Sequence, residues 1–143
     1  MVKGSGFLDV KRARQLLARA EDALKYAYAP YSKFKVGCAL LTGDGEIYTG
    51  CNIENASYGA TNCAERTAIF KAVSEGHRNF VALAIAGNAS HVLPCGICRQ
   101  VIMEFCSDLE IITGRSDGDI KCFNIRELLP HAFTAQYIPG RDG

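Results

Sequence analysis

Three cysteines in two segments constrain the fold of this chain more than any other feature. The segments are Cys63-Ala64-Glu65 and Pro94-Cys95-Gly96-Ile97-Cys98, and they are well separated in the sequence. Three thiolate ligands predict a tetrahedral zinc ion whose fourth position stays open to water, whereas a structural zinc site has four Cys or His ligands. The fold must therefore bring both segments to one ion.

The cysteines have three other interpretations. A disulfide-built secreted domain usually has an even number of Cys behind a signal peptide. This chain has seven Cys and starts without an apolar stretch, so a reduced, cytoplasmic location is expected. A structural zinc knuckle needs a second Cys-x-x-Cys pair, which the sequence lacks. The third interpretation is a thioredoxin-like redox pair, which the Cys95-x-x-Cys98 motif taken alone does not exclude.

The surroundings of both segments favour the catalytic zinc site. Asn62 is predicted to cap a helix whose first turn is Cys63-Ala64-Glu65, and Pro94 precedes a second helical pattern that begins at Cys95. A helix N-terminus favours anions and lowers thiol pKa values, which suits thiolates that share one ion. The two helix starts are therefore expected to converge on the zinc.

Hydrophobic periodicity predicts the rest of an α/β fold. Apolar residues at three- and four-residue steps predict a first helix from Val10 to Ala27, ended by Pro30. The turn Thr42-Gly43-Asp44-Gly45 predicts a hairpin, and Gly76 closes the helix that starts at Cys63. The predicted strands cover residues 36–41, 47–53, 81–86, 110–113 and 120–123. Their order with the helices predicts a mixed five-stranded sheet with helices on both faces.

Four segments of the chain resemble the zinc-dependent cytidine deaminases, in the family's order, and the resemblance runs from about Leu16 to Phe133. They are Phe34-Lys35-Val36-Gly37, Asn52-Ile53-Glu54-Asn55-Ala56, Cys63-Ala64-Glu65-Arg66-Thr67-Ala68 and Pro94-Cys95-Gly96-Ile97-Cys98-Arg99-Gln100. The resemblance implies a three-layer α/β/α fold and hydrolytic deamination of cytidine and 2′-deoxycytidine to the uridines and ammonia, in pyrimidine salvage. It also implies one Zn²⁺ per subunit, with Cys63, Cys95 and Cys98 as ligands, and a homotetramer.

Glu65 is the expected acid and base of this reaction. Only Ala64 separates the Glu65 carboxylate from the ligand Cys63. The carboxylate can therefore accept a proton from water in the open position without binding the metal. Asn62-x-x-Glu65 is also the pattern of a capping box, in which Glu65 would only satisfy a backbone N–H. The resemblance gives Arg66 the role of donating hydrogen bonds to the ligand sulfurs, against the alternative of an exposed helix residue.

The resemblance assigns other residues to the substrate. Asn52 and Glu54 are expected to bind the ribose hydroxyls, and Phe34 to contact the pyrimidine ring. The backbone N–H of Ala64 is suited to hold the pyrimidine O2 atom. Turn or cap positions are the alternative for Asn52 and Glu54, and core packing is the alternative for Phe34.

Further residues are expected to act between subunits. Ala56 and Tyr58 match positions that reach a neighbouring subunit's site, and Phe133 resembles an aromatic side chain that covers the base from another subunit. Ordinary packing is the alternative for Phe133. No ligand role falls to His77, His91 or His131, and small buried apolar roles are expected for Cys38, Cys51, Cys106 and Cys122.

Length and charge limit the domain organisation and the partners. A chain of 143 residues with 48% hydrophobic content is expected to form one domain, 1–143, with flexible ends at 1–6 and 138–143. A net charge of +1 predicts no basic surface for nucleic acid. No apolar stretch approaches the roughly 18 residues of a membrane-spanning helix. A small-molecule substrate is therefore expected, with neither nucleic acid nor membrane as a partner.

Two other functions stay open. A blasticidin-S-type deaminase shares the Cys-x-Glu and Pro-Cys-x-x-Cys segments, although the segment Asn52-Ile53-Glu54-Asn55 argues against it. A protein of a different class would keep zinc for stability or partner binding without catalysis. Glu65 beside an open coordination position argues against that second alternative.

Overall fold

The structure is a computed structural model that describes residues 8–140. The ends predicted to be flexible, 1–6 and 138–143, lie outside these residues except for 138–140. Along the chain the elements are α1 (Val10–Leu24), β1 (Val36–Thr42), β2 (Ile47–Cys51), η1 (Tyr58–Ala60), α2 (Ala64–Ser74), β3 (Phe80–Gly87), α3 (Gly96–Phe105), β4 (Glu110–Gly114), β5 (Ile120–Asn124), α4 (Ile125–Leu128) and η2 (Ala135–Tyr137).

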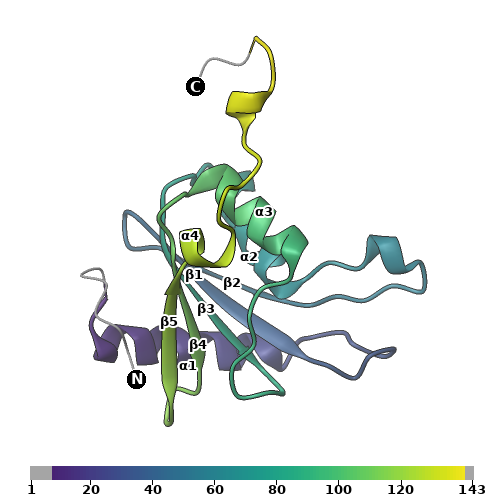
Figure 1. The fold of residues 1–143 in the computed structure, drawn as a ribbon. Coiled ribbons are helices and arrows are strands. Elements are labelled where there is room, and N and C mark those ends of the chain that lie inside the picture. Colours follow the sequence, from purple (N-terminus) through teal and green to yellow (C-terminus); the bar gives the residue numbers. More distant parts are fainter. Residues whose placement is uncertain (1–7, 141–143) are drawn as a thin grey trace.

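The five strands form one mixed sheet in the order β2-β1-β3-β4-β5. The pair β3 and β4 is parallel, and the other neighbouring pairs are antiparallel. Helix α1 covers one face, where Leu16 and Leu17 pack with Ala39 and Ile112. Helices α2 and α3 cover the opposite face (Figure 1). These layers confirm the predicted α/β/α fold with a mixed five-stranded sheet, including the central, buried strand β3.

Helix α1 ends at Leu24 and not at Ala27, so its predicted end is wrong by three residues. The reason is a contact with a distant segment. The backbone N–H of Tyr28 donates to the carbonyl oxygen of Asn52 at 2.9 Å, and the Tyr28 carbonyl accepts from Glu54 N–H at 2.8 Å. Because these bonds need extended backbone, the chain leaves the helix before Pro30. The two segments then project side by side beyond the sheet (Figure 1).

The hairpin is antiparallel as predicted, with Leu41 opposite Ile47. Strand β2 ends at Cys51, whereas the sequence predicted a strand to Ile53. Ile53 instead makes isolated bridges to Tyr28 and Asn62. The residues after β2 therefore belong to the projecting segment and not to the sheet.

Two glycines let the helices lie close to the sheet. A Cβ atom at Gly37 would lie 2.1 Å from the carbonyl oxygen of Ala20 in α1. One at Gly50 in β2 would lie 2.5 Å from the backbone nitrogen of Ala68 in α2. Real Cβ atoms do not come this close to backbone, so only glycine fits at either position. The close approach at Gly50 fixes the first turns of α2 against the sheet.

The predicted cap of α2 is wrong by one residue. Cys63 occupies the N-cap position, with extended backbone, and makes no side-chain capping bond. The Asn62 side chain instead donates to the Thr67 hydroxyl at 3.1 Å. The capping box of Asn62 and Glu65 is therefore not formed, and the Glu65 side chain is not used to cap the helix. The helix closes as predicted, with Gly76 at φ +95°.

Candidate active site

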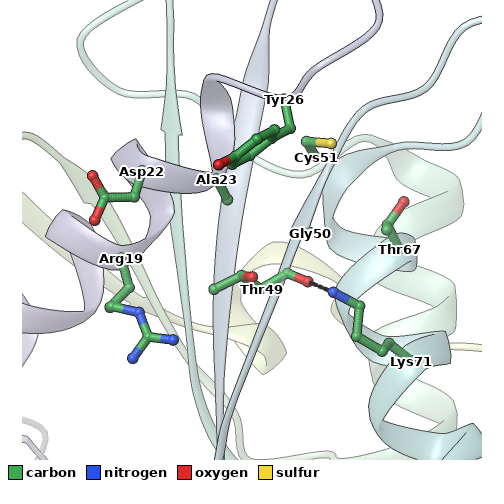
Figure 2. A pocket seen from close by; sticks show the side chains of 9 residues that line it. All are labelled: Arg19, Asp22, Ala23, Tyr26, Thr49, Gly50, Cys51, Thr67 and Lys71. Carbon is green, nitrogen blue, oxygen red and sulfur yellow. Dashed lines mark hydrogen bonds between the residues drawn. The ribbon is translucent and has the colours of Figure 1, made fainter.

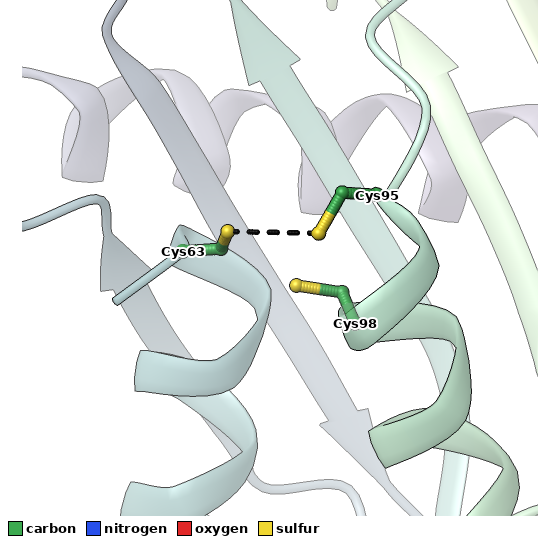
Figure 3. Close-up of side chains that lie close together, drawn as sticks. All are labelled: Cys63, Cys95 and Cys98. Atoms are coloured by element: carbon green, nitrogen blue, oxygen red, sulfur yellow. Dashed lines mark hydrogen bonds between the residues drawn. The ribbon is translucent and has the colours of Figure 1, made fainter. Parts of the chain in front are cut away.

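The three cysteines meet at the N-termini of α2 and α3 (Figure 3). Cys63 is the N-cap of α2, Cys95 is the N-cap of α3, and Cys98 lies in the first turns of α3. Their sulfur atoms all lie within 4.8 Å of one another. The predicted convergence of the two helix starts is therefore confirmed.

The spacing of the sulfurs fits a metal ion and not a disulfide. Cys63 Sγ and Cys95 Sγ are 3.8 Å apart, and all three cysteines are free. A disulfide would need about 2.05 Å between the sulfurs. Zinc–sulfur bonds of about 2.3 Å at tetrahedral angles place two ligand sulfurs about 3.8 Å apart. Three soft thiolates at this spacing match the ligand preference of zinc and leave its fourth position open.

Arg66 and the neighbouring thiols stabilise negative charge on Cys63. The Arg66 guanidinium donates from Nη2 to Cys63 Sγ at 3.2 Å, which is the contact that the sequence predicted. A hydrogen bond from Cys98, followed by Arg66, lowers the pKa of Cys63 to about 5 against the opposing effect of burial. The same thiol pair raises the pKa of Cys98. The Arg66 contact thus favours the thiolate form that a metal ligand must take.

Glu65 lies in the first turn of α2 and is only 4% exposed. Burial raises the pKa of Glu65 to about 7, and the charge of Cys63 adds to this effect. Cys38 lies next to it in β1, and burial and Glu65 raise the pKa of its thiol. A bound cation would favour the ionised carboxylate, since opposite charges attract. Glu65 is therefore a buried carboxyl group that can exchange a proton near neutral pH.

A cavity of about 330 Å³ opens beside the cysteines. Seven residues that the sequence assigned to the site line it, namely Phe34, Asn52, Glu54, Cys63, Ala64, Glu65 and Cys95. Among the described residues that line this cavity there is no Lys, Arg or His. The cavity therefore joins a metal-ligand cluster, a buried acid and a polar rim in one space.

Asn52 and Glu54 hold the backbone of the segment that carries Phe34. The buried Asn52 side chain accepts from Val36 N–H at 2.9 Å and donates to the Phe34 carbonyl at 2.7 Å. The Glu54 carboxylate accepts from the backbone N–H groups of Tyr31 and Ser32 and from the Ser32 hydroxyl. These bonds lower the pKa of Glu54, with the Ser32 hydroxyl as the largest cause. Their expected contacts with ribose stay predictions.

Known proteins are similar to this chain over most of its length. Residues 10–114 match the family model of the cytidine and deoxycytidylate deaminase zinc-binding region. A cytidine deaminase from Halalkalibacterium halodurans is 53% identical over 125 residues, which cover 86% of this chain and 95% of that protein. The chain belongs to the cytidine and deoxycytidylate deaminase family.

Further comparisons agree with this membership. A cytidine deaminase from Sporosarcina psychrophila is 52% identical over 131 residues, covering 90% of this chain and 94% of that protein. The crystal structure of a cytidine deaminase from Burkholderia pseudomallei superposes with a TM-score of 0.80 at 48% identity, covering 83% of this chain and 97% of that chain. The chain is thus a zinc-dependent deaminase, and its cluster of three cysteines accounts for one zinc ion per subunit.

Three of the residues predicted to bind the substrate do not line the cavity. Tyr58 is 76% exposed and contacts Tyr31, with ring centroids 6.1 Å apart. Phe133 is 59% exposed and stacks on Tyr137 at 5.7 Å. Ala56 is exposed on the segment between β2 and α2. Their assignment to a neighbouring subunit's site stays a prediction.

The sequence did not single out several residues that complete the cavity. Val92 and Leu93 line it from the segment before α3, and Ser32 lines it from the turn before Phe34. Val92 and Leu93 directly precede Pro94, so their nearness to the second cysteine segment was the available signal. Ser32 had no comparable signal, because its contacts depend on a residue more than twenty positions away.

A second cavity of about 320 Å³ lies between α1, β2 and α2, and none of the three clustered cysteines lines it (Figure 2). Lys71 donates there to the carbonyl oxygen of Thr49, which lies on the edge strand β2. This contact occupies an edge carbonyl that could otherwise pair with another strand. Cys51 lines the same cavity.

The remaining cysteines and histidines have structural surroundings. Cys38 and Cys122 are buried as predicted, whereas Cys51 and Cys106 are only half-buried. His91 pairs with Asp119 at 3.1 Å. Within residues 8–140, His77 and His131 also lie outside the metal-ligand cluster. No helix of this described part is long and apolar enough to cross a membrane.

Proposed function

We infer that this chain deaminates cytidine and 2′-deoxycytidine to uridine and 2′-deoxyuridine, with release of ammonia. The observation that carries this conclusion is the buried Glu65 in one cavity with a cluster of three thiols. Relatives of more than 50% identity that bear the name cytidine deaminase support the same substrate. We also propose that the chain forms one domain over residues 1–143.

When bound, the zinc ion supplies a Lewis acid that makes water acidic enough to attack at neutral pH. Glu65 accepts the first proton of that water and passes it to ring N3 while the bond from oxygen to C4 forms. Glu65 then takes the second proton and gives it to the amino group. The bond from C4 to nitrogen breaks, ammonia leaves, and C4 keeps the oxygen as a carbonyl.

Other groups of the chain support this reaction. The Ala64 backbone N–H at the start of α2 is suited to hold the pyrimidine O2, and Phe34 to contact the ring. Three thiolates and Zn²⁺ carry a net charge of about −1. The N-termini of α2 and α3 and the Arg66 contact with Cys63 Sγ offset this charge.

The cavity favours a nucleoside over a nucleotide. A phosphate monoester carries about −1.5 to −2 charge at pH 7. The described lining of the cavity offers that phosphate two carboxylates, Glu54 and Glu65, and no cationic side chain. Buried or partly buried phosphate without a cationic partner is costly, so a free nucleoside is the substrate that fits.

We also propose a homotetramer in which neighbouring subunits complete each site. Ala56, Tyr58 and Phe133 are exposed, so a second copy can reach them. A role in pyrimidine salvage in the cytoplasm follows from the proposed substrate and from reduced cysteines. Neither nucleic acid nor a membrane is proposed as a partner.

Absorbance assays on the zinc-loaded protein test the substrate. Loss of ultraviolet absorbance is expected with cytidine and 2′-deoxycytidine, and much slower loss with cytidine 5′-monophosphate. Turnover of blasticidin S without turnover of cytidine would support the antibiotic-directed alternative. A zinc-loaded protein that is inert to all these compounds would support the non-catalytic alternative.

A further inference from the structure

We propose that Ser32 is a positioning residue of the active site, which ties the Glu54 carboxylate to the backbone of Phe34. Sequence patterns gave Ser32 no role, and its side chain is not part of the expected acid, ligand or ribose set. The proposal rests on the proposed function, because Glu54 and Phe34 matter to turnover only if the cavity binds a nucleoside.

The Ser32 hydroxyl makes two hydrogen bonds at once. It donates its proton to Glu54 Oε2 and accepts the backbone N–H of Phe34 at 3.0 Å. The other carboxylate oxygen, Oε1, accepts the backbone N–H groups of Tyr31 at 2.9 Å and Ser32 at 3.1 Å. A hydroxyl has one proton and two lone pairs, so both bonds are compatible. One side chain thus connects an expected ribose-binding group to an expected base-contacting residue.

The turn around Ser32 is held from both sides. Lys33 has φ +61°, a left-handed conformation that non-glycine residues adopt only when their surroundings impose it. Its N–H donates to the Ala29 carbonyl at 3.0 Å, and its own carbonyl accepts from Asn88 Nδ2 at 3.0 Å. These bonds fix the direction in which the chain enters Phe34.

Hydrogen bonds hold the backbone of Phe34 on both sides of its Cα atom. Its carbonyl accepts from Asn52 Nδ2 at 2.7 Å, and its N–H donates to Ser32 Oγ. Asn52 is buried, whereas Ser32 is exposed at the cavity. Removing the Ser32 hydroxyl would therefore release the N–H side of Phe34 and one oxygen of Glu54 together, while the carbonyl side stays in place.

This geometry predicts an effect on binding and not on the chemical step. Within residues 8–140 the Ser32 hydroxyl bonds to Glu54 and to the Phe34 backbone, and not to Glu65 or the clustered cysteines, so the groups that transfer protons and hold zinc stay as they are. A loosened Glu54 and Phe34 must be ordered by the nucleoside itself. The ordering cost lowers the affinity for ground state and transition state alike, which raises KM and leaves kcat unchanged.

Steady-state kinetics with cytidine on the zinc-loaded protein test the proposal. For Ser32→Ala we expect KM to rise about tenfold with kcat within about twofold of wild type, as loss of a hydrogen bond to a charged group predicts. Ser32→Thr keeps a hydroxyl and should restore KM. Ser74→Ala is the matched control, because the Ser74 hydroxyl donates only to the Lys71 carbonyl at the end of α2. Thermal melts verify that each variant is folded.

A double-mutant cycle separates positioning through Glu54 from a general loss of structure. If Ser32 acts through Glu54, Ser32→Ala should add little to the KM of Glu54→Ala, since coupled residues are not additive. A wild-type KM for Ser32→Ala, a fall in kcat alone, or full additivity with Glu54→Ala would each overturn the proposal. Inactivity of the wild type on cytidine would instead refute the proposed function and the role of Ser32 with it.

Discussion

Glu65 and Arg66 are adjacent in the chain but have opposite electrostatic effects on the sulfur cluster. Arg66 donates to Cys63 and stabilises its thiolate, whereas Glu65 places a carboxyl group in the same buried space. Burial of a carboxyl group favours its protonated form. The α2 N-terminus therefore offers one side chain that holds negative charge on sulfur and another that exchanges protons.

Loss of Arg66 should weaken metal binding. Arg66→Gln removes the charged donor to Cys63 Sγ, and loss of such a partner of a metal ligand typically costs about 10–100-fold in metal affinity. Competition with a zinc chelator should therefore strip the variant at a lower chelator concentration than wild type. Arg126→Gln is the control, because Arg126 pairs with Asp108 on the exposed surface. Equal zinc retention in both variants would contradict this role of Arg66.

Zinc uptake should weaken in acid, because protons and zinc compete for the same sulfurs. The pKa of Cys63 is lowered to about 5, so its thiolate predominates at neutral pH and is lost as the pH falls through that value. The hydrogen bond between Cys63 and Cys98 is the largest cause of this shift and raises the pKa of Cys98, so Cys98 must lose its proton when zinc binds. Titration of the zinc-free protein with zinc at pH 7 should therefore release fewer protons than three ordinary thiols would. Release of one proton from each of the three cysteines at pH 7 would show that the Cys63 thiol is not activated.

Sequence motifs predicted the residues of the chemistry and missed part of the cavity wall. The ligands Cys63 and Cys98 and the acid Glu65 could be predicted because the Cys-x-Glu and Cys-x-x-Cys spacings are typical of a catalytic zinc site. Ser32 could not, because its role depends on the contact with Glu54 across the projecting segments.

The helix starts are the elements that build the site. Cys95 and Cys63 are both N-caps, so each sulfur lies where backbone N–H groups point outward. Strand and helix order could be predicted from hydrophobic periodicity, since each element carries its own pattern. The end of α1 could not be predicted, because the pairing of Tyr28 with Asn52 that ends it joins segments far apart in the chain. Local cap rules favoured Asn62, but its side chain bonds to Thr67.

A side chain at Gly50 should displace α2 from the sheet. The Cβ atom of Gly50→Ala would lie 2.5 Å from Ala68 N and 2.7 Å from Ala64 O. We expect a loss of about 1–3 kcal/mol in the free energy of unfolding, as for other overpacked sites. Urea denaturation measures it. Gly118→Ala is the control, because its nearest new contact is an ordinary 3.5 Å to Arg115. Equal stability of the two variants would contradict the close approach of β2 and α2.

Large exposed side chains gather on the segments that project from the sheet and on the C-terminal segment. They include Tyr26, Tyr28, Tyr31, Tyr58, Phe133 and Tyr137. Exposed aromatic side chains in such number are typical of surfaces that contact another protein. A second copy of the chain is the partner that the proposed shared site needs.

Light scattering should give a particle of four times the 15.5 kDa chain mass. Phe133→Ala should raise KM for cytidine if that ring covers the base of a neighbouring subunit. Glu104→Ala is a suitable exposed control on α3. A monomer with full activity would contradict the shared site.

The proposed reaction requires Glu65 to transfer protons beside a zinc ion that it does not bind. Glu65→Gln keeps the shape of the side chain and removes its basicity. The variant should keep about one zinc ion per chain while cytidine turnover falls by at least ~10²-fold, the usual contribution of a general acid and base. Zinc content and the cytidine absorbance assay on the same sample measure both quantities. Retained turnover, or loss of zinc together with turnover, would contradict this role of Glu65.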